Sequence, residues 1–343
     1  MSVNDGMFIS KKEVTIIMSD KNEVLSYISL QNVPVSMGKI KQAVTFSVSE
    51  RTVRRWLNEA SNQGKVTIEG EKRTRTYLPT AMGKPQPLFH FLAGKTEHTQ
   101  QNILDLLRDY WTHESTSLAG NSLSLPETKF VLGTGLAIDD KPVNEHQEIL
   151  GHAAAILLVY RMVETGVTKQ SFFDLHQAVQ SELCHDRENP CGAWRAKKNG
   201  RYIFADNNTS IYLEYVHPSG INKLMNQVIK YINSHRHVDD IHAAIKAYVK
   251  IHLAITHINP FWHDNARIAR LVANIPLISS GLLPIVIPSD KCKQYFQMLS
   301  CYELAIRKPI PTTGISPKID LLHEFEQFCF ECYQQTVNLV EIG

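Results

Sequence analysis

Residues 258–270, INPFWHDNARIAR, contain side-chain types that bind phosphate groups. Asn265 can donate hydrogen bonds, and the guanidinium groups of Arg267 and Arg270 pair with phosphate in a strong, directional way. A loop that leads into a helix also presents free backbone amides to an anion. The segment therefore predicts a site for a phosphorylated ligand.

A predicted helical framework would position this loop, with one helix ending near His257 and the next beginning at Arg267. From residue 97 onward the apolar residues follow a helical spacing. Between the helices, residues 192–215 alternate around Gly200 and predict a β-hairpin. The expected fold class is mostly α, with helices over 97–113, 124–133, 143–165, 170–182, 220–235, 239–257, 267–281, 289–307 and 317–340.

The composition is typical of a globular protein. The chain has 343 residues, of which 43% are hydrophobic and 20% are charged, and this length is enough for two domains. No apolar run reaches the roughly 18 residues that a transmembrane helix needs, and the first residues lack the pattern of a secretory signal. We expect a cytoplasmic protein with no membrane partner, whose six scattered cysteines are reduced.

Positive charge is concentrated in residues 21–80, which hold ten Lys or Arg and five acidic residues, whereas the whole chain has a net charge of +2. This imbalance indicates an anionic partner. The pattern predicts three short helices and then two strands around a Gly-Glu turn. The third helix would begin at a capping box of Ser47 and Glu50 and end at Gly64. Three helices and a basic hairpin resemble a winged helix-turn-helix.

Duplex DNA is the predicted partner of this region. A winged helix lays its third helix in the major groove and its hairpin along the backbone. The basic side chains there would meet phosphates or guanine edges. A solvated basic face on a protein-interaction domain is the alternative. The predicted DNA-binding residues are Arg51, Arg54, Arg55, Lys72, Arg73 and Arg75.

The chain divides into four predicted parts. Residues 1–20 form a lead segment and residues 21–80 the winged helix-turn-helix. Residues 81–96 form a linker, because the stretch from 79 to 96 lacks periodicity and holds three prolines and two glycines. Residues 97–343 form the helical domain that contains the predicted phosphate site.

Three segments of the last part resemble the Fic family, in the family's order. The motif segment is similar to the signature His-Pro-Phe-x-Asp/Glu-Gly-Asn-Gly-Arg-x-x-Arg. STSLAGNSLSLPETKFVL (115–132) resembles the inhibitory-helix region, and PCGAWRAKKNGRYIF (190–204) resembles the Pro-Gly-x-x-Arg stretch and flap hairpin. The resemblance covers about residues 100–340. It implies an all-helical Fic-type bundle with a β-hairpin flap, preceded here by a winged helix-turn-helix.

Fic proteins mostly transfer AMP from ATP to a hydroxyl group of a target protein. The resemblance therefore implies ATP as substrate and Mg²⁺ or Mn²⁺ as metal, and positioning and electrostatics carry most of such a transfer. It implies that Asn265, Arg267 and the backbone at Ala266 hold the α- and β-phosphates, and that Arg270 reaches the γ-phosphate. The flap would pin the target by strand addition. The flap residues are Gly200, Arg201 and Tyr202.

Four motif positions depart from the family pattern. Asn259 stands where the family has its catalytic His, and it cannot act as a base. His263 stands at the metal-ligand position, and Asp264 and Ala266 stand at the two glycines. His263 or His257 could serve as the general base instead, and the alternative is that neither does. Asp264 could hold the metal. If a glycine position needs positive φ, a side chain there costs about 1 kcal/mol, and Asp tolerates it better than most residues.

The inhibitory segment departs as well. The family places there a Glu that forms a salt bridge with the second motif arginine, whereas this chain has Ala119. We therefore expect no autoinhibition of that type through Arg270. The same Glu is thought to organise the water in relatives that also remove AMP, so removal here would need a substitute such as Glu114 or Asp264.

Three functions are consistent with the residues. The first is an atypical protein adenylyltransferase, with AMP removal left open as a second activity, brought by its winged helix to a chromatin- or nucleoid-associated target. The second is a catalytically inactive, nucleotide-sensing DNA-binding regulator. The third is transfer of phosphocholine or UMP, because fold does not settle chemistry. A homodimer is expected, as in many relatives.

Overall fold

The computed structural model describes two compact units, Met1–Pro87 and Leu88–Gly343. Each unit has a hydrophobic core of its own. Most of the predicted lead segment and residues 81–87 of the predicted linker lie outside the described residues, while the rest of that linker belongs to the second unit. The described residues are 20–29, 31, 33–44, 48–62, 65–70, 74–80, 88–180, 191–204, 210–306, 315 and 322–342.

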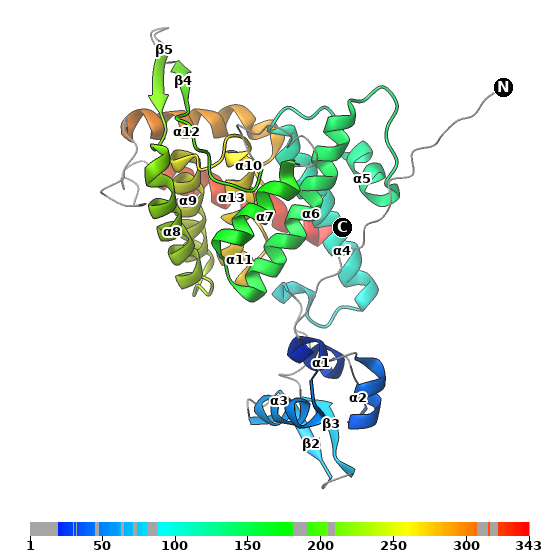
Figure 1. Ribbon diagram of the computed structural model, residues 1–343. Helices are drawn as coiled ribbons and strands as arrows, with labels where there is room; N and C mark the ends of the chain where they lie inside the picture. Colours follow the sequence, from blue (N-terminus) through cyan, green and yellow to red (C-terminus); the bar gives the residue numbers. More distant parts are fainter. Residues whose placement is uncertain are drawn as a thin grey trace, which may run out of the picture. The chain divides into compact units, whose positions relative to one another are not determined.

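The described residues of the first unit form three helices (Figure 1) and a small antiparallel sheet with strand order β1-β3-β2. The side chains that fill its core come from all three helices and from the sheet, with Tyr77 of the central strand almost fully buried. The elements are α1 (Asp20–Ser29), β1 (Val35–Ser36), α2 (Met37–Ala43), α3 (Glu50–Asn62), β2 (Val66–Glu69) and β3 (Thr76–Pro79).

Helix α3 buries the face that its sequence spacing predicted. Val53, Leu57 and Ala60 are in the core, and Trp56 is partly buried against it. Ser47 and Gly64, predicted to begin and end the helix, lie outside the described residues. The hydroxyl of Ser49 accepts a hydrogen bond from the amide of Thr52 at 3.3 Å and so satisfies a free donor of the first turn.

The second unit is mostly helical, which confirms the predicted fold class (Figure 1). Its two strands pair into the predicted hairpin, which projects beyond the helices. Its elements are η3 (His90–Leu92), α4 (Glu97–Ser117), α5 (Leu125–Thr134), α6 (Val143–Thr165), α7 (Lys169–Gln180), β4 (Gly200–Phe204), β5 (Ser210–Glu214), α8 (Pro218–Ser234), α9 (Ile241–Ile258), α10 (Asn265–Val272), α11 (Ile275–Ser279), η4 (Ser289–Lys291), α12 (Cys292–Ile306) and α13 (Leu322–Ile342).

Helix α9 is the centre of this unit. It packs against α8, α10, α11 and α13, and almost every side chain from Ala244 to Ile258 is buried. A helix that is apolar on all faces belongs in a protein core or in a bilayer. Within the described ranges, no helix has the length and hydropathy that a membrane span needs. The burial of α9 fixes the position of the loop that follows it.

The prediction of a single helix over 267–281 is wrong, because the chain forms α10 and α11 with a break between them. Asn274 lies at this break and is fully buried. Its amide bonds the backbone N–H and C=O of Ile285, at 2.7 and 3.0 Å. Pro276 follows in the first turn of α11, where the missing N–H costs nothing. A long-range hydrogen-bond pair therefore sets this break.

The expectation that the cysteines are reduced is wrong for Cys191. Cys191 is disulfide-bonded. Cys292, Cys301, Cys329 and Cys332 are free thiols. Burial raises the pKa of Cys332 to about 12. Cys329 and Cys332 of α13 are completely buried and pack in the core of the second unit.

Candidate phosphate-binding site

A pocket of about 370 Å³ lies where the motif loop, the start of α10 and the base of the hairpin meet. It brings together nine of the predicted site residues: Asn259, His263, Asp264, Asn265, Ala266, Arg267, Arg270, Ala119 and Gly200. The other lining residues are Leu118, Asn199, Tyr215, Trp262 and Phe296.

Two left-handed residues shape the motif loop. Asn259 ends α9 with φ 50°, and Asp264 precedes α10 with φ 59°. Asp264 stands where the family motif has a glycine, so this glycine position does need positive φ. Asp is one of the residue types that tolerate this region, at a cost of about 1 kcal/mol. Ala266, at the other glycine position, is not among the positive-φ residues and lies within α10.

The motif loop and the first turn of α10 have consecutive backbone amide groups that are free to bind a ligand. Within the described ranges, the amides of residues 262–267 donate to no acceptor, and the first bond of α10 runs from Ile268 N to Asp264 O. Such consecutive free donors at a helix N-terminus favour an anion.

Asn265 shapes this loop from within. Its Nδ2 donates to the Asn259 side chain at 3.1 Å and to the Phe261 carbonyl at 2.9 Å, while its Oδ1 accepts from the Phe261 amide at 2.8 Å. Both polar atoms are thus engaged inside the loop, although Asn265 was predicted to contact phosphate.

Arg267 and Arg270 line the pocket and are nearly buried, with 5% and 3% of their surface exposed. Arg270 donates to the hydroxyl of Ser115 at 3.1 Å and to its carbonyl at 2.8 Å, and lies over the ring of Tyr295. In the described part of the chain, no carboxylate forms an ion pair with Arg270.

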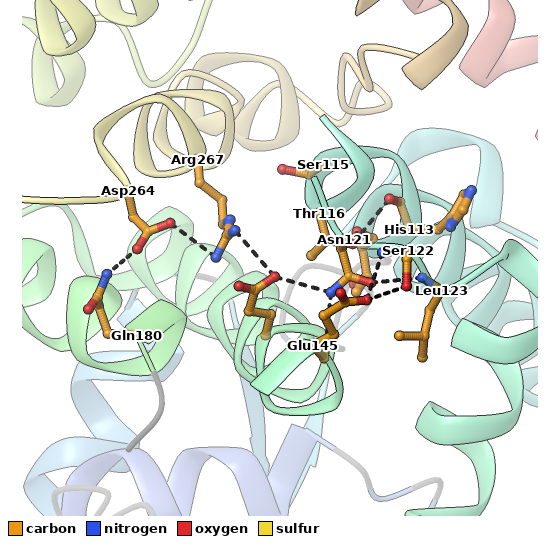
Figure 2. Close-up of polar contacts among 12 residues, drawn as sticks. His113, Ser115, Thr116, Asn121, Ser122, Leu123, Glu145, Gln180, Asp264 and Arg267 are labelled. Atoms are coloured by element: carbon orange, nitrogen blue, oxygen red, sulfur yellow. Dashed lines mark hydrogen bonds and ion pairs between the residues drawn. The ribbon is translucent and has the colours of Figure 1, made fainter. Parts of the chain in front are cut away.

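Arg267 is different, because it pairs with Asp264 at 3.1 Å and with Glu148 at 3.7 Å. Figure 2 shows its guanidinium between Asp264 and the polar cluster around Asn121. Its Nε has no hydrogen-bond partner. Burial, and then the charges of the two arginines, lower the pKa of the neighbouring His152, so this imidazole stays neutral. Arg267 and Arg270 are the two arginines that line the pocket.

The two candidate bases occupy different environments. His263 is exposed and lines the pocket. His257 is buried within α9, with its ring 6.2 Å from that of Tyr302, and is not among the lining residues. The interior face of α9 thus holds His257 in the core. Glu114, considered as a substitute for the missing inhibitory Glu, accepts from the amide of Ser289 and does not line the pocket.

Asp264 is the acidic residue that lines the pocket. Its carboxylate forms an ion pair with Arg267 and accepts a hydrogen bond from the side-chain Nε2 of Gln180. The described residues contain no group of three His, Cys, Asp or Glu side chains that could hold a metal by themselves. Mg²⁺ is often bound through one or two carboxylates together with substrate phosphates, and an aspartate beside a phosphate pocket fits that pattern.

The sequence pattern did not single out Arg195, which joins the motif loop to the hairpin. It is 3% exposed, and its side chain donates to the carbonyls of Asn259 at 2.7 Å and of Lys197 at 2.8 Å, and also to that of Val216. Its amide donates to the carbonyl of Pro260. Arg195 therefore caps the end of α9 and holds both sides of the hairpin base. Its place in the family-like Pro-Gly-x-x-Arg stretch was the available signal.

The three predicted flap residues lie in three different environments. Gly200 lines the pocket, and a Cβ there would collide with the Leu213 carbonyl at 2.4 Å, so the close approach requires glycine. Arg201 points to α12, where it pairs with the buried carboxylate of Glu303. Tyr202 is 66% exposed and pairs across the hairpin with Tyr212. The hairpin is thus anchored on one face and open on the other.

Another side chain beside the motif loop, His176, was also missed. Its ring stacks on Phe261 at 4.0 Å, and its Nδ1 accepts from the amide of Gly192. Burial lowers the pKa of His176 to about 4, so it is neutral and supports the loop through packing. Contacts between segments this distant in the chain leave no periodic signal in the sequence.

On the first unit, α3 presents an open groove lined by Arg51, Arg54 and Arg55. Arg51 and Arg55 are exposed, whereas Arg54 is bonded to Glu50 and to the hydroxyl of Tyr77. Arg75 is partly buried, with an enclosed Nε. Lys72 and Arg73 lie outside the described residues.

No protein-family model matches the chain. The protein adenylyltransferase Fic of Drosophila erecta is 24% identical over 234 residues, which are 67% of this chain and 41% of that protein. The Drosophila persimilis protein of the same name is 25% identical over 235 residues, covering 67% and 40%. The chain thus spans about two fifths of the length of these curated relatives.

Two solved structures share the fold. A Fic domain containing signaling protein from Bacteroides thetaiotaomicron superposes with a TM-score of 0.60 at 17% identity, over 74% of this chain and 94% of that one. Fic-1 from C. elegans gives a TM-score of 0.55 at 18% identity, over 74% and 68%.

The helical bundle with its hairpin and pocket therefore has the Fic fold. The sequence matches to curated Fic adenylyltransferases support the Fic-domain family for this part of the chain.

Proposed function

We propose that the chain binds ATP in the pocket at the start of α10 and transfers AMP to a hydroxyl group of a target protein. The observation that carries the proposal is that two buried guanidinium groups and a row of open amides face one pocket. Charge-assisted bonds from such donors are strong where water is excluded. The similarity to protein adenylyltransferases supports AMP as the transferred group.

In this proposal the chain contributes mainly position and charge. The amides at the start of α10 and Arg267 hold the inner phosphates, and Arg270 binds the outer phosphate. A bound Mg²⁺ or Mn²⁺ would be held by Asp264 and would neutralise phosphate oxygens. The target hydroxyl oxygen forms a bond to the α-phosphorus while the bond to the bridging oxygen breaks and pyrophosphate leaves. His263, exposed at the rim, takes the hydroxyl proton. The proposal covers transfer and not AMP removal, because Glu114 is engaged elsewhere.

For the first unit we propose duplex DNA as partner. The order helix, strand, helix, helix, strand, strand, with the two last strands paired, supports a winged helix-turn-helix. Arg51 and Arg55 are exposed on one side of α3 and can reach a phosphate or base edge. Arg54 instead joins α3 to β3 through its bond to the Tyr77 hydroxyl, and it also bonds Glu50 within α3. A DNA-associated cytoplasmic location, a chromatin or nucleoid target and a homodimer stay predictions.

Incubation with α-labelled ATP and Mg²⁺ or Mn²⁺ is expected to label the chain itself or a protein in an extract, with stronger labelling when duplex DNA is present. The label should remain after denaturation, because AMP is covalently attached. Changing His263 to Ala should lower the rate by roughly 10²-fold or more, the usual contribution of a general base. Labelled UTP and CDP-choline test the other transfer reactions.

A matched His257→Ala variant separates the two candidate bases, and it should transfer AMP at the wild-type rate wherever it folds normally. Transfer that survives the His263 change would exclude that residue as base. ATP binding without label under every condition would overturn the transfer proposal and favour a nucleotide-sensing regulator.

Replacing both Arg51 and Arg55 by Glu should abolish duplex binding by the full-length chain. Each substitution removes a phosphate contact and adds a repelling charge, so affinity at moderate salt should fall roughly 100-fold or more. Lys129→Glu with Lys246→Glu is the matched control, because these exposed residues give the same charge change on the second unit. Fluorescence anisotropy with labelled duplex measures the change. Equal loss in both double variants would contradict a DNA-binding role for α3.

A further inference from the structure

Glu148 of α6 lies outside the motif, and its carboxylate forms an ion pair with the guanidinium of Arg267, which also pairs with Asp264. The distance is 3.7 Å from Glu148 Oε2 to Arg267 Nη2, while Asp264 Oδ1 lies 3.1 Å from Nη1. Only 5% of Arg267 is exposed, so the contact is poorly screened by water. Both terminal nitrogens of an arginine that lines the phosphate pocket therefore face negative charge.

Glu148 is held in this place by the loop that follows α4. Asn121, which is 8% exposed, donates from Nδ2 to Glu148 Oε2 at 3.1 Å and to the Glu145 carbonyl at 3.0 Å. The amide of Leu123 donates to Oδ1 of the same Asn121 at 3.1 Å. Figure 2 shows Asn121 directed at this cluster. The carboxylate is thus fixed beside Arg267 and does not swing freely into solvent.

We propose that Glu148 is a specificity-determining residue of the phosphate pocket, which selects a metal-bound nucleotide over a bare phosphate anion. A bare triphosphate or pyrophosphate must compete with two carboxylates for Arg267 and is repelled by both. A nucleotide with a divalent cation carries less negative charge, and its cation attracts the same carboxylates. The inference rests on the proposed nucleotide site, and it adds a residue outside the motif.

Glu148→Gln keeps the shape and the bond from Asn121 while removing the charge. It is expected to tighten binding of inorganic pyrophosphate and of ATP in EDTA by roughly twofold to fivefold, the upper part of the range for one partly exposed ion pair. Binding of ATP with Mg²⁺ should change much less. Glu145→Gln is the matched control, since Glu145 lies on the same helix and accepts from Ser122 at 2.7 Å without a contact to Arg267. Isothermal titration calorimetry measures each dissociation constant on the full chain.

A gain of affinity is hard to obtain from a damaged fold, so the test separates specificity from a structural role. If Glu148→Gln has the same dissociation constants as Glu145→Gln and the wild type, both with Mg²⁺ and in EDTA, the inference fails while the proposed function stands. If Glu148→Gln weakens binding of every ligand, Glu148 supports Arg267 instead of competing for it, and the inference is again wrong. If no variant and no wild-type protein binds any of these ligands, the proposed nucleotide site itself fails.

Discussion

Replacing Arg195 by Met is expected to lower the free energy of unfolding of the second unit by about 3 to 5 kcal/mol, the usual effect of removing one side of a buried charged hydrogen-bond set. The change leaves the carbonyls of Lys197, Val216 and Asn259 without this donor, and the bond to the Val216 carbonyl is a buried one. Urea unfolding monitored by circular dichroism measures the loss. A midpoint temperature lower by roughly 10 °C should accompany it.

The matched variant is Arg195→Lys, which keeps the charge but can reach fewer of these carbonyls, so its loss should be intermediate. Burial lowers the pKa of Arg195, which shows that the charge is costly in this place. A methionine variant as stable as the wild type would mean that removing this buried charge offsets the lost hydrogen bonds. The hairpin would then be held mainly by Arg201 and Glu303.

Replacing Arg270 by Ala should weaken ATP binding by about 2 to 3 kcal/mol, or roughly 30-fold to 150-fold, the contribution of charge-assisted hydrogen bonds in a buried site. In the proposed arrangement Arg270 meets the outer phosphate. AMP, which lacks that phosphate, should therefore bind the variant and the wild type equally. Calorimetric titration with ATP, ADP and AMP gives the three dissociation constants.

Ser115→Ala is the control for this prediction, because it removes one hydrogen-bond partner of Arg270 and leaves the charge in place. Its ATP affinity should change by less than a few-fold. Thermal unfolding of both variants checks that the α4–α10 contact persists. Equal weakening of ATP and AMP in Arg270→Ala would place this arginine elsewhere than at the outer phosphate.

Much of the framework was predictable from local pattern. The spacing of apolar residues located the helices of the second unit, including the buried α9, and the alternation around Gly200 located the hairpin. The spacing of apolar residues was insufficient where contacts with another segment determine the end of a helix. The break between α10 and α11 depends on the bonds of Asn274 to Ile285, which periodicity cannot reveal.

The candidate site divides in the same way. From the sequence alone we predicted an anion-binding loop before α10, because Asn265, Arg267 and Arg270 are close in the chain. We also expected Arg270 to have no inhibitory carboxylate, because Ala119 stands at that position. Tertiary structure decided which side chains surround that loop. It directed the Asn265 side chain into the motif loop, buried His257 on the interior face of α9, and placed Glu148 beside Arg267. Helical periodicity gives the buried face of each element, whereas the partner of a buried charge depends on how separate helices pack.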